Sequence, residues 1–270
     1  IHIITESDLI MANVNSVLPK LIAKYGYDEL ITIPAGTDWT QELSRGIQLL
    51  QLEEFWNEEE LFDINKFANI YSLTAALQQL DKEDIEIITG SPLFMVNFNN
   101  IISRVVAASQ YNEIITIPVG IDWTSEIYHL VEVLNIDNFW TDESFDYTKV
   151  LELNSYKGIT TSEAKAITSS VLFAANINNL INYVLESKDF GIDVVLPAYI
   201  NWTNEFVVIS KLLEVEAFQD ENGNVKLSSF MDVEAYKCLT EDDIDLLTQS
   251  TLVMANIDSL VDGMLEKTGL

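Results

Sequence analysis

Carboxylates, indole rings and carboxamides recur at fixed spacing along this chain, and they are the side chains best suited to chemistry. Three clusters recur: Asp38, Trp39 and Glu42; Asp122, Trp123 and Glu126; Asn201, Trp202 and Glu205. Grouped carboxylates can hold a cation, and indole rings can stack on sugars or on basic peptides. Because Asp, Asn and Glu are also preferred at helix N-termini, we interpret the acids as helix-start residues and the tryptophans as packing residues. A glycan or peptide platform made by the tryptophan row is the alternative.

Each tryptophan of these clusters follows an asparagine by 26 residues. The pairs are Asn13 and Trp39, Asn97 and Trp123, and Asn176 and Trp202, and Asn256 begins a fourth copy. Such internal periodicity is the signature of a repeat protein. The sequence therefore predicts copies of about 80 residues, spanning 1–84, 85–163 and 164–243, with a partial copy over 244–270.

Each copy predicts helices joined by one extended connector. A short helix, capped by Asp81, by Thr160 or Thr161, or by Thr240, is followed by a serine that caps a longer helix containing the asparagine. A β-branched connector then ends in Pro34, Pro118 or Pro197, and the proline argues against a central strand. A third helix starts at the tryptophan, and the variable segment after it is expected to contain a fourth, near 67–80 and 227–239. The predicted fold is all-α: an α-α solenoid forming one continuous elongated unit.

The asparagine row has a structural and a functional interpretation. Asn is a poor helix former, so its place in an apolar helix requires a specific partner. We expect the carboxamides to satisfy the polar backbone of the connectors; a row of ligand-binding amides is the alternative. Trp56 and Trp140 occur in two copies, and Gln219 takes their place in the third, which indicates a rim position and makes both tryptophans candidate binding residues.

Composition and motifs argue against several classes of function. The formal charge of −29 disfavours nucleic acid and anionic membranes and favours basic partners. His2 and His129 are the only histidines and do not recur, and the recognised nucleophile, phosphate-loop and zinc motifs are missing from the sequence. The segment starting at Asp220 lacks the spacing of a calcium loop and predicts a tight turn instead. No catalytic residue, metal or cofactor is predicted, although a two-carboxylate hydrolase remains a remote alternative.

The series Thr-x-Ser-x-Leu-x-x-x-Asn, Ile-x-Ile-Pro and Trp-Thr-x-Glu resembles the tandem helical repeats of very long, acidic surface proteins of Gram-positive and wall-less bacteria. The resemblance covers the whole chain and implies a cell-surface stalk or adhesin segment, with a cytoplasmic scaffold as the alternative. Both ends of the sequence fall inside a copy, so we expect a piece of a longer protein that contacts neighbouring repeats. Apolar faces near Ile1–Leu9 and along Leu252–Leu265 are expected to favour end-to-end self-association.

Overall fold

The computed structural model describes residues 7–26, 28, 31–67, 70–108, 112–141, 145–146, 148–187, 190 and 192–269. Within these ranges the regular structure is helical and no β-strand forms, which confirms the all-α class. The chain divides into two compact units, Ile1–Leu134 and Asn135–Leu270, here called unit 1 and unit 2.

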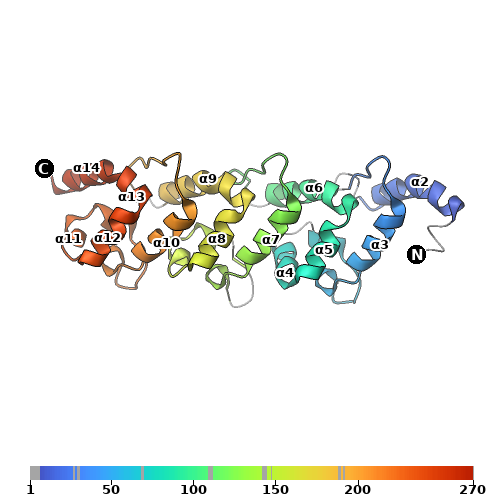
Figure 1. Ribbon diagram of the computed structural model, residues 1–270, viewed down its shortest axis with the longest axis horizontal. Helices are drawn as coiled ribbons and strands as arrows, with labels where there is room; N and C mark the ends of the chain where they lie inside the picture. The colour runs from blue at the N-terminus through green and yellow to red at the C-terminus, as the bar shows by residue number, and fades with distance from the viewer. Residues whose placement is uncertain are drawn as a thin grey trace. The chain divides into compact units, whose positions relative to one another are not determined.

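Figure 1 shows the helices of both units. Those of unit 1 are α2 (Asp8–Lys24), α3 (Trp39–Leu49), η1 (Glu53–Phe55), η2 (Ile64–Phe67), α4 (Ile70–Gln79), α5 (Lys82–Thr89), α6 (Pro92–Ala108) and α7 (Trp123–Leu134). Those of unit 2 are η3 (Asp137–Phe139), η4 (Lys149–Leu151), η5 (Leu153–Tyr156), α8 (Thr161–Ser169), α9 (Val171–Ser187), α10 (Trp202–Leu212), η6 (Glu216–Phe218), η7 (Leu227–Met231), α11 (Val233–Tyr236), α12 (Glu241–Gln249), α13 (Thr251–Ala255) and α14 (Ile257–Thr268).

The predicted helix starts are confirmed by their caps. Asp81, Thr160 and Thr240 each form a reciprocal capping box with the acid three residues later. Each box satisfies two backbone N–H groups that a helix start would otherwise leave unpaired. The three recurring tryptophans are the first residues of α3, α7 and α10, as predicted. Local sequence therefore determines where these helices begin.

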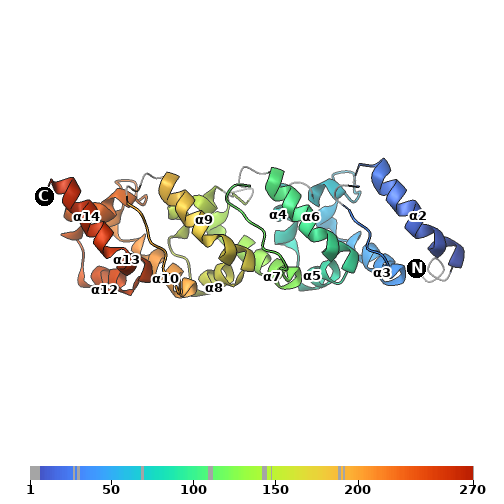
Figure 2. The same cartoon turned by 90° about the horizontal axis from the view of Figure 1, so that it is seen from above.

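The predicted connectors are confirmed as extended segments without strand pairing among the described residues. They cover 31–38, 115–122 and 192–201, and their prolines are partly buried. Figure 2 shows the segment 192–201 passing alongside α13 and α14 before it reaches α10. In unit 1, segment 31–38 likewise passes beside α6, where a side-chain bond joins the two.

The fourth helix was predicted correctly in one place only. Near 67–80 the structure contains α4, but near 227–239 it contains the 3-10 helix η7 and the single turn α11. Asp232 explains the interruption, because its carboxylate accepts from the Glu234 N–H and so starts a new helix. The last long helix also differs from the prediction: it is divided at Asn256, whose backbone angles are φ −115° and ψ 11°.

Large apolar side chains fill the core of each unit. The recurring phenylalanine after the tryptophan helix is fully buried, as Phe55 in unit 1 and as Phe218 in unit 2. Val261 and Leu265 on α14, in contrast, are 44% and 42% exposed. They lie within the apolar face expected along Leu252–Leu265, whereas most of the face expected near Ile1–Leu9 lies outside the described residues.

Two loops of the variable segments share one geometry. Gly223 occupies the left-handed region at φ 77°, and its N–H donates to the Asp220 carbonyl at 2.9 Å. The predicted tight turn is thus confirmed. In unit 1, Glu60 holds the equivalent place at φ 59°, and its N–H donates to the Asn57 carbonyl at 3.0 Å. A side chain with a Cβ is strained in this conformation, so the loop at Glu60 is less stable than it could be.

Replacing Glu60 with glycine is therefore expected to stabilise unit 1. Relief of strain outweighs the extra entropy of the unfolded glycine, for a net gain of about 0.5–1 kcal/mol in the free energy of unfolding. Urea denaturation measures the change. Glu59→Gly removes the same charge from a residue without a positive φ; an equal gain there would trace the effect to charge and contradict this explanation.

Candidate functional site

Asn97 on α6 bonds the backbone of a residue 65 positions earlier in the chain. Its Oδ1 accepts from the Thr32 N–H at 2.6 Å, and its Nδ2 donates to the Thr32 carbonyl at 2.8 Å. Nδ2 also donates to the Leu93 carbonyl at 2.7 Å, one turn back in α6. Asn97 itself is 4% exposed, whereas Thr32 is exposed, so the bonds join the interior to a connector at the surface.

Asn256 makes the same bonds in unit 2. Its Oδ1 accepts from the Val195 N–H at 2.6 Å, and its Nδ2 donates to the carbonyls of Val195 and Leu252, both at 2.8 Å. Asn176 on α9 is also buried and donates to the Leu172 carbonyl at 2.7 Å. Asn13 on α2 is exposed.

The carboxamide takes the place of a neighbouring β-strand. It offers one acceptor and one donor to a single connector residue, the same pair of bonds that a strand would supply. A segment rich in β-branched residues can therefore stay extended beside a helix without unpaired polar groups. For Asn97 and Asn256 this agrees with the structural interpretation, because their amide groups bond connector backbone within the protein.

Glu42 on α3 reaches the N-terminus of α6 in unit 1. Its Oε2 accepts from the Ser91 hydroxyl at 2.7 Å, and its Oε1 accepts from the Leu93 N–H at 3.2 Å. Ser91 in turn caps α6, because its Oγ accepts from the Phe94 N–H at 3.0 Å. The Glu42 side chain is 6% exposed. One carboxylate and one hydroxyl therefore join α3 to the start of α6.

Glu205 on α10 makes the equivalent contact with α13 in unit 2. Its carboxylate accepts from the Ser250 hydroxyl at 2.5 Å, from the Thr251 N–H at 2.8 Å and from the Leu252 N–H at 3.2 Å. Glu205 is 2% exposed. All three partners are donors, which is the arrangement that suits a carboxylate.

These buried carboxylates are compensated by helix N-termini. An ionised group in an apolar interior is costly unless it is paired. The exposed N–H groups of a helix start carry about half a positive charge and favour an anion. Sequence reasoning placed these glutamates correctly in the first turn of their own helices but missed the second helix that each one binds. The sequence did contain a signal for this contact, because the glutamate and the capping serine recur together from copy to copy.

The tryptophan row lies mainly inside the protein. Trp39 and Trp123 are 6% and 4% exposed, whereas Trp202 is partly buried. The Trp123 indole N–H donates to Asn99 Oδ1 at 2.6 Å, and its ring packs edge-on against Phe98 with centroids 4.9 Å apart. The two rings of unit 1 therefore pack within the fold, as the structural interpretation expected.

A shared hydrogen bond explains why Gln219 can replace a tryptophan. The Trp56 indole N–H donates to the Leu50 carbonyl at 2.9 Å, at the C-terminus of α3. The Gln219 amide donates to the Leu213 carbonyl at 2.9 Å, at the C-terminus of α10. Both side chains are partly buried, as is Trp140. The position requires a donor that reaches the last carbonyls of a helix, and both residue types supply one.

Tyr156 in unit 2 is a partly buried ionisable group. Its hydroxyl donates to the Val150 carbonyl at 2.7 Å, and burial raises the pKa of this phenol above its usual value. Tyr236 repeats the arrangement: it donates to the Phe230 carbonyl at 3.0 Å, and burial also raises its pKa. Each phenol bonds the carbonyl six residues before it, and the raised pKa makes each a weaker acid than an exposed tyrosine.

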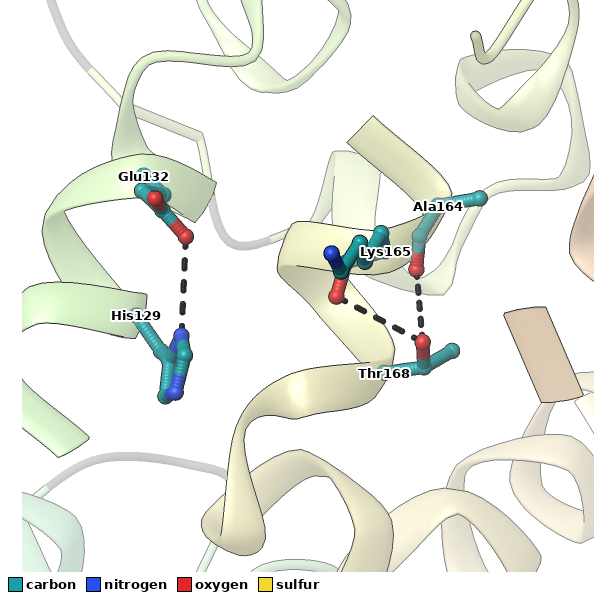
Figure 3. Close-up of polar contacts among 5 residues, drawn as sticks. All are labelled: His129, Glu132, Ala164, Lys165 and Thr168. Carbon is teal, nitrogen blue, oxygen red and sulfur yellow. Dashed lines mark hydrogen bonds and ion pairs between the residues drawn. The ribbon is translucent and has the colours of Figure 1, made fainter. Parts of the chain in front are cut away.

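Figure 3 shows the local polar contacts of His129 in unit 1 and of Thr168 in unit 2. His129 Nδ1 lies 3.5 Å from Glu132 Oε2, three residues later on α7. The Thr168 hydroxyl donates to the Ala164 carbonyl at 2.9 Å, within α8. The His129 contact is a partly exposed pair on one helix, and pairs of this kind contribute little to stability. His2, the other histidine, lies outside the described residues.

The described part of the chain contains no group of three or more His, Cys, Asp or Glu side chains placed to hold a metal ion. None of the described helices combines the length and apolar character needed to cross a membrane. No protein-family model matches this chain, and neither the curated proteins nor the solved structures include a significant match.

Substitution of Asn97 by leucine is expected to destabilise unit 1 by about 1–3 kcal/mol, because it removes the protein partner of the Thr32 backbone N–H and carbonyl. Thermal and urea denaturation measure the loss. Asn100→Leu, at an exposed position of the same helix, is the matched control and should change stability by less than about 0.5 kcal/mol. Equal melting temperatures for Asn97→Leu and the unmodified protein would refute the assigned role.

Substitution of Glu205 by glutamine is expected to destabilise unit 2 by about 1–3 kcal/mol. The NH₂ group of the new amide faces groups at the start of α13 that are themselves donors, so at least one hydrogen bond is replaced by a repulsive contact. Glu214→Gln, an exposed residue shortly after α10, removes the same charge and controls for the reduced net charge. A stability loss that is the same for both variants would show that the buried contact has no special role.

Proposed function

We propose that this chain is a non-catalytic helical repeat scaffold: an α-α solenoid of three copies and a partial fourth. The observation that carries the proposal is that the same two side-chain hydrogen-bond contacts occur in both units. Glu42 with Ser91 and Asn97 with Thr32 recur as Glu205 with Ser250 and Asn256 with Val195. Side chains that recur in every copy, and are bonded within the protein, suit a stacked array better than a single reactive centre.

The scaffold would act as a spacer or interaction surface of a longer protein, with the cell surface as the proposed location. Support comes from the resemblance to acidic bacterial surface repeats and from the strong negative charge, which favours solubility and basic partners. In such an array the variable segments after the shared phenylalanine are the parts free to differ between copies. Specific recognition of a peptide, glycan or basic protein is therefore proposed for those segments.

Deletion of one whole copy tests the array. Removing Phe98–Asn176 joins Asn97 to Ile177, so the pattern of helices and of the hydrogen bonds between them continues unbroken. The shortened protein is expected to keep its helical circular dichroism per residue and to unfold cooperatively. Removing Phe98–Lys157 deletes a length that is not one period and should abolish cooperative unfolding. If both deletions behave alike, the repeat assignment is wrong.

Accessibility of tryptophan separates a scaffold from a tryptophan binding platform. A variant that keeps only Trp123, with phenylalanine at the other tryptophans, is expected to show weak quenching by acrylamide, because the ring is 4% exposed. A variant that keeps only the partly buried Trp56 should be quenched more strongly. Quenching of Trp123 as strong as that of a free tryptophan derivative would favour the platform.

A further inference from the structure

Unit 2 contains an apolar cavity of about 200 Å³. It lies among η5, α9, α10 and the residues around α13 and α14. Figure 1 labels α9, α10, α13 and α14. The α9 wall is aliphatic and includes Ile177, Ile181 and Val184. Aromatic rings of Phe206 and Phe230 contribute to the other walls. The cavity is therefore bounded by the kind of side chains that usually fill a core.

The ionisable and amide side chains in the wall are already bonded. The Glu205 carboxylate binds the start of α13, and the Asn256 carboxamide binds the Val195 backbone. The Tyr156 hydroxyl donates to the Val150 carbonyl. The remaining polar side chain, Trp202, contributes its ring beside Phe206, with centroids 6.3 Å apart. A guest with a charge or several polar groups would lose its hydration without new partners.

Volume and lining together indicate the class of guest. A buried water needs two to four polar partners, and a cavity of about 150 Å³ lined by leucine, isoleucine and phenylalanine stays dry and binds benzene. The cavity of unit 2 has a similar apolar lining and is somewhat larger, and it is partly open to solvent. We propose that it is a binding site for a small, uncharged, apolar molecule, such as a single aromatic ring with a short alkyl group. This site is independent of the scaffold role.

Binding of toluene to the full chain tests the proposal. Toluene is expected to bind saturably, to raise the melting temperature of unit 2, and to give nuclear Overhauser contacts to the methyl groups of Ile181 and Val184. Phenol has a similar shape but carries a hydroxyl group without a partner in the wall, so it should bind at least about tenfold more weakly. If toluene does not bind, the site does not exist. If phenol binds as tightly as toluene, the proposed ligand class is wrong.

Filling the cavity provides the second test. Val184→Phe places a larger side chain in the space, so the variant is expected to keep its cooperative unfolding and to lose the toluene-dependent shift. Val171→Phe, at a 53% exposed position of α9, is the matched control and should bind toluene like the unmodified protein. Unchanged toluene affinity in Val184→Phe would overturn the proposal. If that variant does not fold, the methyl contacts in the unmodified protein decide the question.

Discussion

A carboxylate held in the interior is the interaction on which each unit depends. Glu42 and Glu205 are removed from water, and the start of a second helix supplies the donors that compensate each one. A helix N-terminus can do this because its first N–H groups have no partner within the helix. The contact therefore satisfies two sets of polar groups at once. It also fixes which helix N-terminus lies beside the tryptophan helix. The position of that second helix then determines how the core side chains pack.

The other recurring residues act around this contact. In the first turn of α3, Asp38 caps the helix, Trp39 packs into the interior and Glu42 reaches α6. Asn97, one and a half turns into α6, then holds the connector that leads into α3. Side chains thus join the long helix to the tryptophan helix at one point and to the connector at another. The fixed spacing between the asparagine and the tryptophan follows from the length of helix and connector between them.

Local signals in the sequence predicted much of this arrangement. Capping residues, the connector prolines and the recurring tryptophans gave the helix starts and the all-α class, because each acts within a few residues of itself. The hydrogen-bond partner of Glu42 could not be predicted in the same way, since Ser91 lies 49 residues away in the sequence. The interruptions at Asp232 and Asn256 were also missed. In both places a polar side chain competes with continuation of the helix, and the outcome depends on tertiary neighbours.

Amide hydrogen exchange at the start of α13 tests the central claim most directly. Thr251 is the first residue of that helix, where an N–H ordinarily has no partner, but here it donates to Glu205 Oε2 at 2.8 Å. Its exchange is predicted to be slower than that of Glu241, the exposed first residue of α12, by at least about 100-fold after correction for intrinsic rates. Equal protection factors for the two amides would contradict the proposed role of the buried carboxylate.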